Sequence, residues 1–280
     1  MKPAPFEYHA PRDLGEALRT LAEVGGKVLA GGQSLIPMMN MRLAAPAHLV
    51  DINRLQELQV MEATEDGVRV GAAVRHAQVE RAEAHPLLTR ALKLVAHPVI
   101  RNRGTVVGSL VHADPAAELP AVLAVLGGSV RVARWDGPAR DVGAEEFFVG
   151  PMESAVQPGE LAVSAYFPAL GARTGAAFEE VARRHGDYAL AGVCAVVTLD
   201  EDGHVEAAKV ACIGVGPVPV VVDVTGSPAD VARVVRERVE PEGDIHASAA
   251  YRRQLVGVLA ERALRNATRE APREAGSRGA

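Results

Sequence analysis

Residues 27–37 read KVLAGGQSLIP, a short apolar run that meets two adjacent glycines and then a proline. The run 27–30 predicts a buried strand, the glycine pair predicts a turn, and a helical turn is expected around Pro37. Glycine lets the main chain approach a ligand closely, and converging backbone N–H groups can bind a pyrophosphate. Gln33 and Ser34 add polar side chains beside the glycines. The segment is therefore a candidate phosphate-binding turn.

A second glycine-bearing segment covers residues 100–109 and reads IRNRGTVVGS, and its part 105–109 is expected to be a loop turn. Arg101 and Arg103 precede its first glycine and are candidate counter-charges for an anion. Neither segment matches the G-x-G-x-x-G fingerprint of dinucleotide-binding folds, and neither has the Gly-Lys-Ser/Thr of a P-loop. A pair of glycines is usually no more than a turn. Spacing alone therefore indicates two possible anion sites and goes no further.

Composition narrows the class of protein. The chain has 280 residues, enough for two domains, and 48% of them are hydrophobic while 23% are charged. No apolar run approaches the roughly 20 residues that a membrane span needs, so no membrane insertion is expected. The net charge of −5 and the dispersed basic residues argue against nucleic acid as a partner. The N-terminus shows no secretion signal, which predicts a cytoplasmic protein.

The periodicity of apolar residues predicts an α+β fold with two parts. Helices are expected at 13–24, 77–84, 87–96 and 116–126, with short strands at 49–52 and 68–72. Four strands in succession are expected at 161–167, 176–182, 192–199 and 205–213, followed by helices near 228–239 and 247–265. Strands followed by helices indicate a separate α+β domain, with a boundary near the loop 171–175.

Several other residues receive ordinary structural interpretations. Cys194 lies in an apolar run and is expected to be a small buried hydrophobe, and Trp135 is expected at a hairpin surface. His112 is interpreted as a partly exposed structural histidine. His185 and Asp187 are expected to position the loop that carries Tyr188. The nine histidines show no paired-ligand spacing, so no metal site is predicted, and no residue is assigned a catalytic role.

The residues around the two glycine segments resemble the FAD-binding medium subunits of carbon monoxide dehydrogenases and related molybdenum hydroxylases. The resemblance rests on five blocks that follow one another along nearly the whole chain. They are AGGQSLIP at 30–37 with MRL at 41–43 and DIN at 51–53, IRNRGTVVGS at 100–109, HADPAAE at 112–118, RRHGDYALAG at 183–192 and ASAAYRR at 247–253.

The resemblance implies a fold like that of vanillyl-alcohol oxidase, with an FAD-binding domain over 1–170 and a C-terminal α+β domain over 171–270. The first domain is expected to divide into subdomains at about 1–55 and 56–170, and residues 271–280 are expected to be a disordered tail. Carried over residue by residue, the implied FAD contacts are Ala30, Gly31, Gly32, Gln33, Ser34, Leu35, Thr105, Val106, Val107, Gly108, Ser109, Asp114, Glu118 and Tyr188.

The implied function is electron transfer through FAD within a three-subunit oxidoreductase. The expected partners are a small iron–sulfur subunit and a large molybdopterin subunit, and the external acceptor is NAD, quinone, oxygen or a protein. One alternative is a stand-alone flavin oxidoreductase that acts on a small metabolite. A second alternative is an assembly module that has lost FAD.

Two positions depart from the family pattern. The second block usually reads Thr-Ile-Gly-Gly-Ser, and Val107 stands where its first glycine is expected. A β-branched residue resists a positive φ and keeps a ligand away from the backbone. Either the backbone at Val107 has an ordinary φ, or FAD is held more loosely than in relatives. A smaller departure is Glu118, which stands where Asp is usual.

Overall fold

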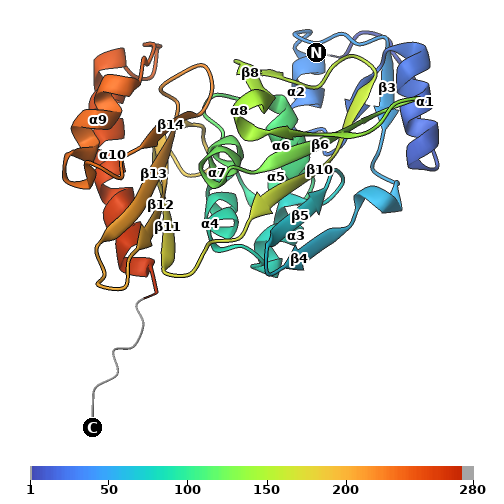
Figure 1. The fold of residues 1–280 in the computed structure, drawn as a ribbon. Helices are drawn as coiled ribbons and strands as arrows, with labels where there is room; N and C mark the ends of the chain where they lie inside the picture. The colour runs from blue at the N-terminus through green and yellow to red at the C-terminus, as the bar shows by residue number, and fades with distance from the viewer. Residues whose placement is uncertain (1, 273–280) are drawn as a thin grey trace.

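The computed structural model describes residues 2–272 and arranges them in alternating layers of helix and sheet (Figure 1). The N-terminal part contains a three-stranded parallel sheet in the order β1–β3–β2, formed by Glu7–His9, His48–Asp51 and Lys27–Leu29. Helix α1 (Leu14–Val24) packs on this sheet and ends at Gly25, whose φ of 61° closes the helix. Ala17, Leu18 and Leu21 are its buried residues, and the helix expected at 13–24 is confirmed.

The second sheet is antiparallel and has the order β4–β5–β10–β6–β7. Its strands are Met61–Thr64, Gly67–Gly71, Glu160–Pro168, Ser129–Arg134 and Arg140–Gly143. Strand β10 returns from far along the chain to lie between β5 and β6. The sequence predicted β5 and β10. The hairpin of β6 and β7 carries Trp135 on its surface, where the Arg19 guanidinium lies 5.7 Å from the ring centroid.

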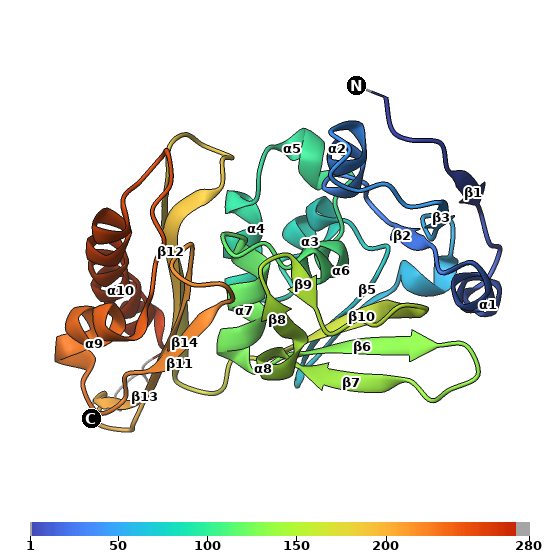
Figure 2. The ribbon, with the colours of Figure 1, turned by 90° about the horizontal axis from the view of Figure 1, so that it is seen from above.

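Seven short helices occupy connections between strands, and several of them contact the second sheet. They are α2 (Leu35–Asn40), α3 (His76–Ala82), α4 (Pro86–Leu94), α5 (Pro98–Arg101), α6 (Val106–His112), α7 (Glu118–Leu126) and α8 (Ala144–Phe147). Beside α8 lies a two-stranded hairpin, β8 (Phe148–Gly150) with β9 (Glu153–Ser154), and a 3₁₀ turn spans Gln56–Leu58. Seen from above, α4 and α7 lie between the second sheet and the C-terminal sheet (Figure 2).

The C-terminal sheet is an antiparallel meander, β11–β12–β13–β14, formed by Thr174–Ala182, Ala189–Leu199, Val205–Ile213 and Val220–Asp223. Helices α9 (Val231–Arg238) and α10 (Ala249–Glu270) cover its outer face, and a 3₁₀ turn at Pro228–Asp230 precedes α9. The predicted α+β fold is confirmed. The last helix runs to Glu270, five residues beyond the predicted end at 265; residues 273–280, where a disordered tail was expected, lie outside the described residues.

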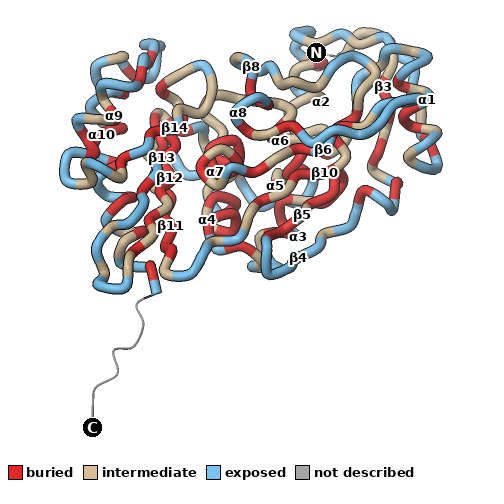
Figure 3. Tube along the Cα trace, in the orientation of Figure 1, coloured by how far each residue is buried: buried red, intermediate tan, exposed pale blue. Residues whose placement is uncertain are grey.

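Both faces of the C-terminal sheet are buried along most of β11 and β12, whereas several residues of β13 and β14 are exposed (Figure 3). Alternate residues of a strand point to opposite faces. Phe178 and Cys194 therefore join the core that contains α4 and α7, while Ala177 and Val193 pack toward α9 and α10. Cys194 is a fully buried free thiol, as the sequence predicted. Among the described residues no helix has the length and apolar character that crossing a bilayer requires.

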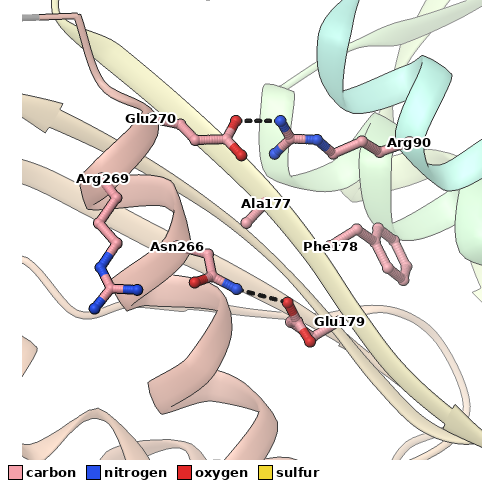
Figure 4. Close-up of a pocket in the computed structure, with 7 residues that line it drawn as sticks. All are labelled: Arg90, Ala177, Phe178, Glu179, Asn266, Arg269 and Glu270. Carbon is pink, nitrogen blue, oxygen red and sulfur yellow. Dashed lines mark hydrogen bonds and ion pairs between the residues drawn. The ribbon is translucent and has the colours of Figure 1, made fainter.

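The last turn of α10 is held against β11 and α4. Arg90 of α4 donates to the carbonyl oxygen of Ala176 and pairs with Glu270, while Asn266 donates to the Glu179 carboxylate at 2.7 Å (Figure 4). These contacts surround a hollow of about 270 Å³. The last turn of α10 is therefore joined to β11 and to α4 at one place.

Gly175 lets α10 approach β11 backbone to backbone. A Cβ atom at Gly175 would lie 2.1 Å from the carbonyl oxygen of Ala267 and 2.3 Å from the amide nitrogen of Ala271. Because both neighbours are backbone atoms, neither can move without shifting the helix. Only 4% of the residues are aromatic, so the core is built mostly from small side chains, and such a core suits this close approach of helix and strand.

We predict that Gly175→Ala lowers the free energy of unfolding by about 1–3 kcal/mol, since an added methyl group must push α10 off the sheet. Gly226→Ala is the matched control, because a Cβ there would meet nothing within 4 Å. Its effect should stay within about 0.5–1 kcal/mol. Urea unfolding of both variants measures the difference. Equal stabilities would mean that the helix adjusts freely at Gly175.

Candidate functional site

The first glycine turn connects β2 to α2 and lines a hollow of about 430 Å³. Gly31 has no room for a side chain, because a Cβ atom would lie 2.3 Å from the carbonyl oxygen of Arg103 and 2.7 Å from the Cα of Gly104. Gly32 has a φ of 74°, in the left-handed region that favours glycine. Glycine is therefore required at position 31 by the close approach of another segment, and it is favoured at position 32 by the backbone conformation.

The backbone N–H groups of five successive residues, 31–35, donate to no acceptor within the part of the chain that the structure describes. Gln33 instead donates its side-chain amide to the Gly31 carbonyl at 3.3 Å. Ser34 precedes α2 but its hydroxyl makes no cap hydrogen bond. Backbone donors seldom stay unpaired unless water or a ligand accepts from them. The turn therefore presents a row of donors suited to an anion.

The second glycine segment is the beginning of helix α6 and not a loop, which corrects the interpretation from the sequence. Thr105 is the N-cap, and its Oγ1 accepts from the Gly108 amide at 3.1 Å. Val106 and Val107 form the first helical residues with buried side chains. Val107 is not among the residues with positive φ. The backbone at Val107 has the φ of an ordinary helical residue, so valine is compatible with the conformation of this segment.

Two side chains join the first turn to the second segment. Asn53 donates its side-chain amide to the carbonyl oxygen of Ala30 at 2.8 Å, and its own Oδ1 accepts from Arg75 at 2.6 Å. Arg75 also donates to the carbonyl oxygen of Arg103 at 2.7 Å. The sequence analysis quoted Asn53 within a motif but assigned it no role, and it missed Arg75. Only the fold brings these residues beside the glycines.

A buried histidine lies behind the second segment. His76 donates its backbone N–H to the Gly104 carbonyl, and its Nε2 lies 3.0 Å from Ser109 Oγ. Burial, above all, lowers the pKa of His76 to about 4, so the ring is neutral near pH 7. A Cβ atom on Gly104 would lie 2.8 Å from its Nδ1. His76 therefore supports the segment from inside, and sequence analysis did not identify it.

The two arginines upstream of the second segment have different surroundings. Arg101 is buried and pairs with Glu80, with Nε 2.8 Å from the carboxylate, and it also donates to the carbonyls of Val95 and Ala96. Arg101 is therefore a structural residue and not the counter-charge suggested from the sequence. Arg103 is exposed and lines the hollow beside the first turn. It is the arginine that can face an anion there.

The remaining predicted site residues form a second group at the other end of α6, which is about 10 Å long at seven residues. Asp114 follows α6 and Glu118 begins α7. Burial and then the Glu180 carboxylate raise the pKa of Glu118 to about 8, while burial raises the pKa of Glu180 to about 7. At pH 7 Glu118 is therefore mostly protonated and can donate a hydrogen bond.

Tyr188 is exposed and reaches this second group from the C-terminal domain. Desolvation and the charges of Asp114 and Glu118 raise the pKa of its phenol to about 12. Asp187 accepts from the Tyr188 amide at 3.0 Å and pairs with Arg183, in agreement with the positioning role expected for it. His185 lies against the ring of His97, with centroids 5.7 Å apart. His112 is half-buried near the end of α6, and burial lowers its pKa.

The family model described as the FAD binding domain in molybdopterin dehydrogenase matches residues 4–170, and the CO dehydrogenase flavoprotein C-terminal domain matches 176–229. The 6-hydroxypseudooxynicotine dehydrogenase complex subunit alpha of Paenarthrobacter nicotinovorans is 39% identical, over 97% of each chain. Caffeine dehydrogenase subunit beta of Pseudomonas sp. (strain CBB1) is 38% identical, over 95% of this chain and 96% of that one.

A solved structure of carbon monoxide dehydrogenase from Hydrogenophaga pseudoflava, in a form that lacks the Mo-pyranopterin moiety of the molybdenum cofactor, has the same fold. It superposes with a TM-score of 0.90 at 33% identity, covering 97% of this chain and 100% of that chain. The family model covers more than half of the chain and the relatives span nearly all of it. The chain thus belongs to the FAD-binding medium subunits of the molybdopterin dehydrogenases, and its cofactor is FAD.

Proposed function

We propose that this chain is the electron-transfer subunit of a three-subunit molybdenum hydroxylase. Electrons from an iron–sulfur small subunit reach the FAD held here and pass to an external acceptor such as NAD, quinone or oxygen. Oxidation of the substrate takes place in a molybdopterin large subunit. The observation that carries this proposal is the packing of two glycine-bearing segments at one hollow lined by Arg103.

In this proposal the FAD pyrophosphate lies against the first turn. The unpaired backbone donors of residues 31–35 supply several hydrogen bonds, and the absence of a side chain at Gly31 keeps this turn and Gly104 in contact. Arg103 supplies positive charge beside them. Thr105–Ser109 completes the site through the first turn of α6. These features fit a doubly charged diphosphate.

The second group of residues is proposed to contact the flavin end of the cofactor. Asp114 and a protonated Glu118 offer an acceptor and a donor for the polar edge of the cofactor, while Tyr188 offers an aromatic face. The length of α6 separates this group from the pyrophosphate site by about 10 Å, a separation that an extended dinucleotide can span. No side chain in either group needs to act as a nucleophile or general base.

FAD, when bound, supplies the exchange of electrons, and the protein contributes binding, orientation and electrostatics. Relatives with the same full-length architecture are named for unlike substrates: a nicotine derivative, caffeine and carbon monoxide. Because chains of the same architecture belong to proteins named for different substrates, we place substrate recognition on another subunit. The expected cytoplasmic location stays a prediction.

Purification of the native complex tests this function. We expect an affinity-tagged copy of the chain, expressed in its own host, to co-purify with one iron–sulfur protein and one molybdopterin protein. The complex should reduce an acceptor only while all three chains are present. A chain that purifies alone, carries FAD and oxidises a small metabolite by itself would support the stand-alone oxidoreductase instead. A chain without flavin in the intact complex would support the assembly module.

We expect FAD to be bound without a covalent link, because neither glycine segment has a suitable attachment residue beside it and both cysteines are fully buried. Acid precipitation of the purified protein should release all flavin into the supernatant as intact FAD. The absorption spectrum and chromatography of both fractions make the measurement. Flavin left in the pellet, or FMN in the supernatant, would contradict the prediction.

Gly32→Val should weaken FAD binding by turning backbone donors away from the diphosphate. A hydrogen bond to a charged group contributes about 1.5–3 kcal/mol, so each donor lost should lower affinity about 10- to 100-fold. Gly127→Val is the matched control, because Gly127 also has a positive φ, 64°, and lies at the end of α7. Titration of apoprotein with FAD compares the two. If both variants bind FAD as tightly as the parent, Gly32 is only a turn residue.

A further inference from the structure

The N-terminal sheet brings together three metal-binding side chains that are far apart in the sequence. Strands β1 and β3 pair in parallel, with Glu7 opposite His48 and His9 opposite Val50. Residues two apart on a strand share a face, and paired residues of adjacent strands point the same way. Glu7, His9 and His48 therefore lie on one face, while Tyr8 lies on the other and donates to Asp51 at 2.5 Å.

The three donor atoms lie close together. His9 Nε2 lies 3.1 Å from His48 Nδ1, and His48 Nδ1 lies 3.5 Å from Glu7 Oε2. All three ligand atoms are within 4.8 Å of one another. Two atoms that are each about 2.0–2.1 Å from a zinc ion at the tetrahedral angle lie about 3.3–3.4 Å apart. The His9–His48 and His48–Glu7 pairs already have nearly the spacing that a tetrahedral zinc ion imposes.

With both rings neutral, hydrogen bonding within the cluster cannot pair all three of its nitrogen and oxygen atoms with one another. A neutral imidazole has one N–H, so only one proton can lie between His9 Nε2 and His48 Nδ1. If His9 donates that proton, the lone pair of His48 Nδ1 is engaged and the Glu7 carboxylate faces it without a proton between them. If His48 Nδ1 carries the proton, its single N–H faces two acceptors, His9 Nε2 and the Glu7 carboxylate. A divalent cation at this point would accept all three lone pairs at once.

We propose that Glu7, His9 and His48 form a zinc site. Two imidazoles and one carboxylate are a donor set that zinc takes in proteins, with water as a fourth ligand where the site is open. The Glu7 side chain is 75% exposed and that of His48 is 26% exposed, so the site is open to solvent on the Glu7 side. A bound ion would fasten β1 to β3, the central strand that also holds β2 and the first glycine turn.

The other cluster of this kind in the described residues is Asp200, Asp202 and His204, in the turn between β12 and β13. Asp200 already accepts from the backbone N–H of His204 at 2.8 Å, which is the ordinary hydrogen bonding of a tight turn. The cluster contains one histidine instead of two, and both Asp202 and His204 are exposed. It provides the matched control for the proposed site.

Calorimetric titration of the untagged, FAD-loaded full-length chain with Zn²⁺ tests the proposal. Titration with Co²⁺ adds a visible spectrum that reports tetrahedral coordination. We expect one ion to bind to the wild type and to His204→Gln with the same affinity. His9→Gln, His48→Gln and Glu7→Gln should each lower the affinity by at least about tenfold, since loss of even an outer-shell partner costs that much. Far-UV circular dichroism checks that each variant is folded.

Glu7→Gln keeps the test decisive if a histidine variant fails to fold, because the exposed Glu7 side chain contributes little to packing. Zinc should also raise the melting temperature of the wild type and leave that of Glu7→Gln nearly unchanged. The proposal is wrong if neither ion binds. It is also wrong if binding survives in Glu7→Gln and His9→Gln, or disappears in His204→Gln.

Discussion

The contact between Gly31 and the backbone of Arg103 and Gly104 is the constraint on which the cofactor site depends. A side chain at Gly31 would overlap the carbonyl oxygen of Arg103, so the two segments can meet only through glycine. Asn53 and Arg75 then hold the same two segments through hydrogen bonds to the carbonyls of Ala30 and Arg103. These two carbonyl oxygens thus accept hydrogen bonds from side chains of the protein, and the N–H groups of the first turn stay available to a ligand. In the proposed site, main-chain geometry would contribute more to anion binding than charged side chains do.

Polar groups near the site are of two kinds. Some hydrogen-bond to the protein's own groups and support the segments that form the site, and others face the hollow. Arg101 and His76 are buried and satisfy the protein's own carbonyl and hydroxyl groups, whereas Arg103 is exposed at the hollow. The same division explains Val107. Its side chain joins the hydrophobic core and its backbone is helical, so the position where the resemblance led us to expect glycine is used here for packing. The site keeps its shape because each supporting group has a partner inside the molecule.

The sequence allowed the fold class, the longer helices and three strands of the C-terminal sheet to be predicted, since apolar spacing sets them locally. The first strand of the expected series, 161–167, belongs instead to the second sheet as β10, and β14 was not predicted. It did not reveal that residues 105–109 begin a helix, because two successive valines and a glycine favour other structures. Asn53, Arg75 and His76 could not be found either, since their role appears only when segments more than 20 residues apart meet. The histidines at 9 and 48 have no informative spacing, and only the parallel pairing of β1 with β3 brings them together. The domain limits at about 170 and 270 stay predictions.

Helices α4 and α7 have a consequence for synthesis of the chain. Seven of the nine residues of α7 are buried, on faces that meet both the second sheet and the C-terminal sheet. A ribosome delivers the N-terminal part first, and domains generally begin to fold as they emerge. Until residues 174–213 follow, one apolar side of α4 and α7 has nothing to cover it. The nascent protein therefore passes through a stage in which this apolar surface is exposed to solvent. Chaperone binding would prevent aggregation most effectively during that stage.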